Sequence, residues 1–139
     1  MHKKIFGLIL IDQITKLIFS GRDFFFGPLH VHLIKNYGLG FSLNFGPLIN
    51  IGVIVLALIF FILYYWQNRM NVSSIGKIIF VLILSGAISN IIDRLYFGFV
   101  RDFLDLGLGF TFNLADLMIV LGLVGLLFTQ PIRKAIIDT

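Results

Sequence analysis

The chain has 139 residues, of which 58% are hydrophobic and 13% are charged, and its formal net charge at pH 7 is +4. This length predicts one compact unit, and a charged share well below the usual level of about 25% indicates a membrane-embedded protein. The Lys and Arg residues are scattered between apolar runs, which argues against nucleic-acid binding, and the absence of Cys excludes disulfides, thiol nucleophiles and Cys-ligated metals.

The N-terminal segment, MHKKIFGLILIDQITK, combines a charged start with an apolar middle, as a signal peptide does. However, Asp12, Gln13 and Lys16 interrupt the apolar run, and no small-residue cleavage site follows them. We therefore predict that this segment is a retained first membrane helix.

Apolar stretches recur along the chain, at about residues 5–19, 48–66, 78–96 and 113–128. A helical span needs roughly 20 apolar residues, or somewhat fewer when its ends are polar. Backbone groups in lipid are satisfied only in helices or closed barrels, and these lengths are helical. The sequence therefore predicts an all-α membrane protein with four transmembrane helices, formed by residues 1–139 as a single integral-membrane domain.

The distribution of cationic residues predicts how these helices are oriented, because cytoplasmic segments carry an excess of Lys and Arg. With both termini in the cytoplasm, the inner segments hold Lys3, Lys4, Arg69, Lys77, Arg133 and Lys134. The outer segments then hold Arg22, Lys35, Arg94 and Arg101. We expect a multi-pass protein of the cytoplasmic membrane, with segments 20–47 and 96–113 on its outer, extracytoplasmic side.

The first outer segment has the pattern of a β-strand. In PLHVHLIKNYG, His30, His32 and Ile34 alternate with the residues between them, a period of two, and Gly and Pro residues on both sides indicate turns. We expect a small extracytoplasmic β-hairpin or β-cradle between the first and second helices. The two histidines share one face of the strand, but an isolated pair is a weak indication of a metal site, so the sequence predicts no metal and no cofactor.

Two aspartates flank a short segment before the last helix: Asp102 in FVRDF and Asp116 in FNLAD. Ionised groups are costly in hydrocarbon, so acids at membrane depth are functional candidates. Two neighbouring carboxyl groups share one proton because their charges repel, and such a pair is suited to activating water against a peptide bond. A structural interpretation also stays open, because Asn113 and Asp116 fit a helix N-cap and a capping box.

Other polar residues lie within the predicted helices. Asp12 and Lys16 are four residues apart, so they share a helix face within ion-pair reach, either as a structural pair or with a direct role in chemistry. The segment SGAISNIIDR places Asn90 and Asp93 three apart, with Arg94 adjacent. Arg94 either neutralises Asp93, which is then structural, or extends to the outer interface to hold loop carbonyls or lipid phosphate.

The strings DQITK, NYGLGFS, SGAISNIIDR, FVRDF and FNLAD occur in this order along the chain. Together they resemble the lipoprotein signal peptidases, the bacterial signal peptidase II family. The resemblance implies a four-helix aspartyl endopeptidase of the bacterial cytoplasmic (inner) membrane. Its substrates would be diacylglyceryl-modified prolipoproteins, cut just before the lipidated Cys, and it would work in contact with membrane lipid. One bundle is enough for such a site, so we expect a monomer.

By this resemblance, Asp102 and Asp116 correspond to the catalytic pair. The supporting positions that match the family's motifs are Asp12, Lys16, Asn36, Gly38, Phe41, Asn90, Asp93, Arg94 and Asn113. Asp105 is a further acid, but it lies outside the motifs. The chain departs from the family's pattern after NYGLGFS, because residues 43–47 lead almost directly into the second helix. We therefore expect a shortened lid over the site.

Interpretations from other functional classes stay open. A small proton-coupled transporter would use Asp12 or Asp116 as its proton carrier and would need ionisable residues near the middle of the membrane. A non-catalytic membrane assembly factor would tolerate the loss of both Asp102 and Asp116. The clustering of acids at the outer ends of the third and fourth helices favours an interfacial peptidase site over a transport path.

Overall fold

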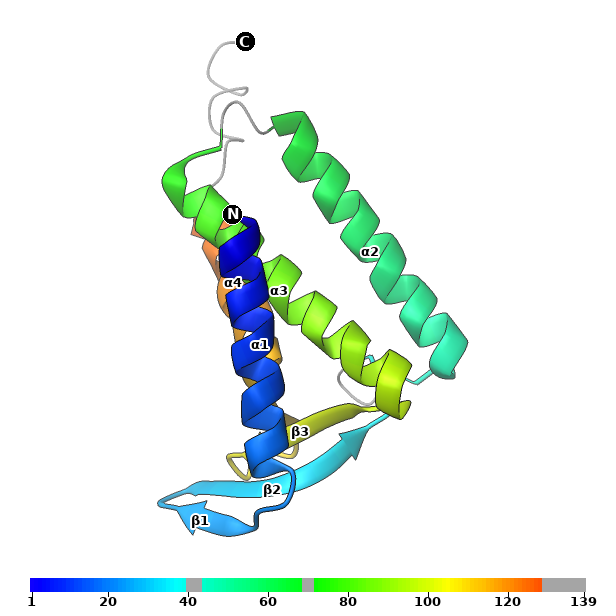
Figure 1. The fold of residues 1–139 in the computed structure, drawn as a ribbon, viewed down its shortest axis with the longest axis vertical. Coiled ribbons are helices and arrows are strands. Elements are labelled where there is room, and N and C mark those ends of the chain that lie inside the picture. Colours follow the sequence, from blue (N-terminus) through cyan, green and yellow to red (C-terminus); the bar gives the residue numbers. More distant parts are fainter. Residues whose placement is uncertain (40–43, 69–71, 129–139) are drawn as a thin grey trace.

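The computed structural model describes residues 1–39, 44–68 and 72–128. Within this part of the chain, helices form a bundle and an antiparallel sheet covers one end of it (Figure 1). The helices are α1 (His2–Phe19), α2 (Pro47–Asn68), α3 (Ser74–Phe97) and α4 (Leu114–Phe128). The strands are β1 (Phe24–Phe26), β2 (Leu29–Asn36), β3 (Val100–Asp105) and β4 (Thr111–Phe112). Each helix overlaps one apolar stretch of the sequence.

Helix α3 is the centre of the bundle, since it contacts the other three helices and also β3. Half of the most apolar 18-residue stretch of α3 is buried, whereas only 6% of the corresponding stretch of α2 is buried. Among the described residues, these two helices are long and apolar enough to cross a membrane, with mean hydropathies of 2.1 and 2.6. Helix α4 is apolar but shorter. Many apolar side chains of α2 are exposed, for example those of Leu48, Leu56 and Phe60, as expected of a surface that lipid covers.

Small residues let α3 and α4 approach closely, as is common between membrane helices. A Cβ atom added at Gly86 of α3 would overlap the backbone oxygen of Ala115 and the side chain of Ile119 in α4. From the other side, a Cβ atom at Gly122 of α4 would overlap Ile83 of α3. The backbones of the two helices are therefore in direct contact where α4 begins, which is also where Asp116 lies.

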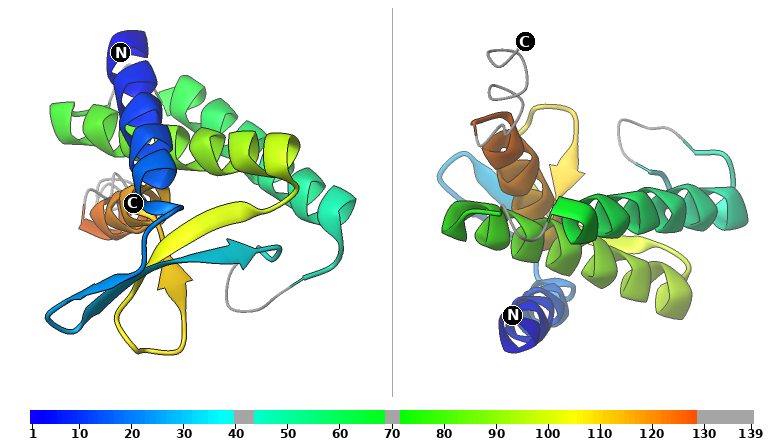
Figure 2. Two further views of the ribbon diagram at one scale, coloured as in Figure 1. Left: turned by 60° about the horizontal axis from the view of Figure 1, so that its bottom comes forward. Right: turned by 90° about the horizontal axis from the view of Figure 1, so that it is seen from above.

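The sheet has the strand order β1-β2-β3-β4, and every neighbouring pair is antiparallel. Strands β1 and β2 come from the segment between α1 and α2, whereas β3 and β4 come from the segment between α3 and α4. Figure 2 shows the strands crossing below the helix ends. In the central pair, Ile34 lies opposite Asp102 and His30 lies opposite Asp105, with a bulge between Val31 and Ile34. The sheet thus joins the two interhelical segments.

The predicted cradle is present, but it is larger than expected. The sequence indicated strands only between the first two helices, whereas segment 96–113 supplies two of the described strands, β3 and β4. The reason is burial: Val100, Arg101, Asp102 and Phe103 are all buried, so β3 has no alternation of apolar and polar residues. The chain is therefore mostly helical with a small sheet, rather than all-α.

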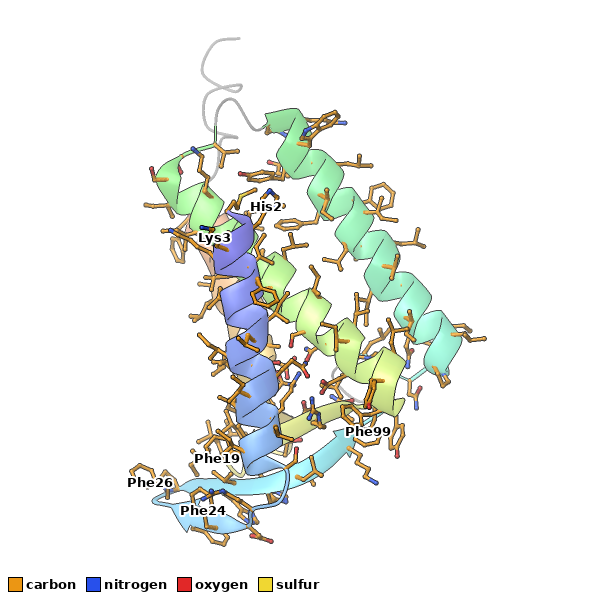
Figure 3. All side chains as sticks on the ribbon, viewed as in Figure 1. His2, Lys3, Phe19, Phe24, Phe26 and Phe99 are labelled. Atoms are coloured by element: carbon orange, nitrogen blue, oxygen red, sulfur yellow. The ribbon has the colours of Figure 1, made fainter. Side chains whose placement is uncertain are left out.

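The two ends of the bundle differ in character. Figure 3 shows His2 and Lys3 at the end where α1 begins, and Phe19, Phe24 and Phe26 at the end that the sheet covers. The rings of Phe19 and Phe103 stack with 5.1 Å between centroids, which connects the end of α1 to β3. Phe26 is 76% exposed on the edge strand β1.

Replacing Gly86 with Ala should lower the stability of the bundle. The new methyl group meets backbone atoms of α4, which cannot rotate away, and overpacking of this kind costs about 1–3 kcal/mol. Gly52→Ala in α2 is the matched control, because nothing lies within 4 Å of its added Cβ and Ala favours a helix over Gly. Thermal unfolding in detergent should give a lower midpoint for Gly86→Ala only. Equal midpoints would contradict the close packing of α3 and α4.

Candidate active site

Asp102 and Asp116 reach the same place from different elements. Asp102 lies on β3 and is fully buried, while Asp116 lies in the first turn of α4 and is half-buried. Asn113, just before α4, connects them. Its side-chain Nδ2 donates to Asp102 Oδ1 (2.6 Å), and its backbone N–H donates to Asp116 Oδ2 (3.1 Å). Two carboxyl groups therefore meet around one asparagine.

The start of α4 also forms the predicted capping box. The N–H of Asp116 donates to Asn113 Oδ1 (3.0 Å), while Asp116 Oδ2 accepts the N–H of Asn113. This reciprocal pair satisfies two backbone donors that a helix start otherwise leaves without partners. The structural role does not compete with a chemical one, because Asp116 Oδ1 is left free of the cap.

Neutral amides surround the remaining carboxylate oxygens. Asn36 of β2 donates to Asp102 Oδ2 (2.9 Å), and Asn90 of α3 donates to Asp116 Oδ1 (2.8 Å). Asn36 is itself held by the N–H of Gly38, which donates to its Oδ1 (2.9 Å). Both carboxyl groups are thus oriented by hydrogen bonds, and the described residues place no cation in an ion pair with either of them.

The surroundings of Asp102 favour its protonated form. Burial is the main cause, and the negative charge of Asp116 adds to it, so that the pKa of Asp102 rises to about 7. The hydrogen bonds from Asn36 and Asn113 act in the opposite direction because they stabilise the anion. Near neutral pH the pair therefore retains a proton, which is what general acid–base chemistry needs.

Asp12 and Lys16 form the ion pair that their spacing predicted, with 2.8 Å between Lys16 Nζ and Asp12 Oδ2. Both side chains are fully buried. Lys16 also donates to Asn90 Oδ1 (2.8 Å). Asp12 accepts the hydroxyl of Ser89 in α3 (2.6 Å) and the N–H of Ala115 in α4 (2.7 Å). One aspartate of α1 therefore fixes the start of α4, the turn that carries Asp116.

Asp93 has a different partner from the one expected. It forms ion pairs with Arg101 of β3 (2.8 Å) and Lys16 of α1 (3.4 Å), rather than with the adjacent Arg94. Arg101 also donates to it from its backbone N–H (3.0 Å). Gln13 of α1 binds both side chains. Sequence reasoning missed Arg101 and Gln13 because the pairing depends on β3 folding back onto α3, which no local pattern indicates.

Arg94 binds backbone carbonyls, one of the two roles considered for it. Its Nη2 donates to the oxygen of Gly38 (2.6 Å) and its Nη1 to the oxygen of Asn90 (3.2 Å). Its Nε is buried and is the one side-chain polar atom, among the described residues, found buried without a hydrogen-bond partner. Arg94 therefore anchors the end of β2 to α3 and keeps one donor unused beside the carboxyl pair.

Two further expectations concern the segment after β2. Phe41 lies outside the described residues, as does residue 43 at the start of the shortened segment 43–47. Asn50 at the start of α2, which sequence reasoning missed, connects described residues on either side of 40–43: it donates to the Tyr37 oxygen (3.0 Å) and accepts from the Phe45 N–H (3.1 Å). Its signal was visible as a polar side chain opening a strongly apolar helix. Asp105 does not join the carboxyl pair but faces His32.

The chain is similar to known peptidases over most of its length. A family model described as signal peptidase (SPase) II matches residues 4–132. The lipoprotein signal peptidase of Syntrophomonas wolfei is 34% identical over 126 residues, which cover 83% of this chain and 81% of that protein. The lipoprotein signal peptidase of Fusobacterium nucleatum is 35% identical over 130 residues, which cover 84% and 77%.

The fold is also similar to solved structures. Two bacterial membrane enzymes whose structures were obtained by the in meso method superimpose on it with TM-scores of 0.75 and 0.71. The first is 24% identical and the alignment covers 90% of this chain and 88% of that one. The second is 26% identical, with 90% and 83% covered.

Replacing Asp93 with Asn should destabilise the protein. The change leaves Arg101, which is only 7% exposed, without its buried counter-ion, and losing one partner of a buried ion pair costs roughly 3–5 kcal/mol. Asp23→Asn is the control, because that side chain is 77% exposed. Thermal unfolding in detergent should show a lower midpoint for Asp93→Asn alone. An unchanged midpoint would mean that Asp93 is not a structural acid.

Proposed function

Because the chain belongs to the signal peptidase II family, we propose that it is an aspartyl endopeptidase that removes signal peptides from prolipoproteins. The scissile bond is the one before the Cys that carries diacylglycerol. The observation that carries the aspartyl assignment is the meeting of Asp102 and Asp116 around Asn113. The proton that this pair retains up to about pH 7 supports it further.

The pair can divide the work of hydrolysis between an ionised and a protonated carboxyl group. The ionised group takes a proton from a water molecule as the water oxygen attacks the scissile carbonyl carbon. The protonated group donates its hydrogen to the carbonyl oxygen, which produces a neutral tetrahedral intermediate. When the intermediate collapses, one of its hydroxyl groups gives its proton to the carboxyl group that is now ionised and re-forms the carbonyl. The C–N bond breaks, and the leaving nitrogen takes up the proton held by the other carboxyl group.

The asparagines and Arg94 support this chemistry by positioning. Asn36, Asn90 and Asn113 hold the carboxyl groups without supplying a positive charge that would remove the shared proton. Arg94 is near enough for its charge to interact with both carboxyl groups, and its hydrogen bonds to Gly38 and Asn90 hold β2 and α3 around them. The burial of these groups strengthens each interaction, because the local dielectric is low.

We place the bundle in the bacterial cytoplasmic membrane as a monomer, with four spanning helices, cytoplasmic termini and the sheet on the outer face. The largely exposed apolar surfaces of α2 and α4 support an environment of lipid. The carboxyl pair lies where helix ends meet the sheet, at the depth where the lipidated Cys of a substrate would leave the bilayer. The signal helix of the substrate then enters sideways from lipid.

Asp102→Asn and Asp116→Asn should each leave a folded protein that no longer cleaves a lipidated precursor. Either change removes one member of the acid–base pair, and such groups contribute about 10²–10⁴-fold to the rate. The assay incubates purified protein in detergent with a diacylglyceryl-modified precursor and follows the shortened product. Asp23→Asn, an exposed acid of the outer segment, is the control and should cut at the normal rate.

Full-rate cleavage by either variant would remove the basis of the aspartyl assignment. Loss of cleavage by Asp93→Asn in a folded sample, together with an active Asp102→Asn, would instead identify Asp93 as the partner of Asp116. The same precursor without diacylglycerol should stay uncut, because the lipid positions the scissile bond at the membrane surface.

The cleavage rate should fall as the pH rises through about 7. The pKa of Asp102 is raised to that value, so below it the pair holds its shared proton and above it both groups become ionised. A doubly ionised pair lacks the acid that protonates the carbonyl oxygen. The measurement is kcat/KM against pH on the lipidated precursor. A rate that stays constant well above pH 7 would show that no shared proton is needed.

A further inference from the structure

A second group of potential ligands lies on the sheet, away from the carboxyl pair. His30 and His32 are two residues apart on β2, and Asp105 is at the end of β3, directly opposite His30 in the strand register. Side chains two apart on a strand share a face, and the diagonal neighbour across a pair is also within reach. The nitrogen and oxygen atoms of these three side chains all lie within 4.8 Å of one another.

The spacing of the three ligand atoms is compatible with a metal site. The distance from His32 Nε2 to Asp105 Oδ2 is 3.3 Å, equal to the separation of about 3.3 Å between two ligands of a tetrahedral zinc ion with bonds of roughly 2.0–2.1 Å. The rings of His30 and His32 stack with 3.9 Å between centroids and an angle of 12°. Phe25 stacks on the outer side of His30 at 4.1 Å, so the imidazoles have little freedom to rotate.

Each ligand is also held by a neighbour. The N–H of Gly107 donates to Asp105 Oδ1 (2.7 Å), which leaves Oδ2 facing the histidines. Second-sphere hydrogen bonds of this kind orient ligands in metal sites. His30 Nε2 contacts Asp23 Oδ1 (2.7 Å), an exposed side chain that can move aside.

We propose that His30, His32 and Asp105 bind one divalent ion of the zinc type on the outer side of the sheet. Imidazole nitrogen and carboxylate oxygen are the ligands that zinc prefers besides thiolate, and about a quarter of each side chain is exposed, so the site is reachable from water. The ion joins β2 to β3. The same two strands carry Asn36 and Asp102, so the ion would hold together the strands that position them. Its binding does not depend on the proposed peptidase activity.

The test is calorimetric titration of zinc chloride into untagged, chelator-treated protein in detergent. The unaltered chain should bind one ion, and His30→Gln, His32→Gln and Asp105→Asn should each weaken binding by about tenfold or more. His2→Gln is the control for histidine content, because His2 lies at the other end of the bundle. Asp102→Asn is the control for zinc held by the carboxyl pair, and both controls should bind like the unaltered chain.

Thermal unfolding provides a second measurement that separates loss of the site from loss of the fold. In chelator, the three ligand variants should melt close to the unaltered chain, since their side chains are partly exposed. Added zinc should raise the midpoint of the unaltered chain and leave the variants unchanged. The proposal is overturned if the double variant His30→Gln/His32→Gln binds zinc as tightly as the unaltered chain, if Asp102→Asn abolishes binding, or if the unaltered chain does not bind zinc.

Discussion

The buried cations of the bundle form ion pairs with aspartates outside the candidate catalytic pair. Lys16 and Arg101 are neutralised by Asp12 and Asp93, in a network with the fully buried side chains of three of these residues. A buried charge without a partner is strongly unfavourable, so these four side chains must come together for α1, α3 and β3 to pack. The consequence for chemistry is indirect. Because the two cations are already paired, neither forms an ion pair with the Asp102 carboxyl group, which can keep its proton.

Asparagine side chains orient the two candidate acids without favouring the ionised form, as a cation would. Asn36, Asn90 and Asn113 come from β2, α3 and the start of α4, and each donates a hydrogen bond to one of the two candidate acids. An amide orients a carboxyl group in either protonation state, whereas an ammonium or guanidinium group favours the anion alone. Asn90 also accepts from Lys16, so the network that fixes the helices also fixes the donors. Stability and reactivity are therefore linked through a single asparagine.

Local sequence patterns predicted the helices, the cap of α4 and the Asp12–Lys16 ion pair, because each of these features depends on residues close in sequence. The resemblance to a family, rather than any spacing, suggested that Asp102 and Asp116 belong together. Strand β3 was missed because it is buried on both faces and therefore lacks a period of two. Its partners were missed with it: the contact of Arg101 with Asp93 and that of Asp105 with His32 exist only once β3 has folded back onto α3 and β2.

The register between β2 and β3 is the element on which these contacts converge. A slip of one residue would turn each of Asp102 and Arg101 to the other face of the sheet. The carboxyl group would then lose Asn36, and the guanidinium group would lose Asp93. The bulge between Val31 and Ile34 divides this pairing into two parts. The part of β2 near Asp102 and the part that carries the histidines are therefore paired with β3 in registers that differ by one residue. Bulges redirect side chains and increase local twist. Asp102 and Asp105 face opposite sides of β3 because they are three residues apart, and the extra residue on β2 lets Asn36 lie with one of them and His30 with the other.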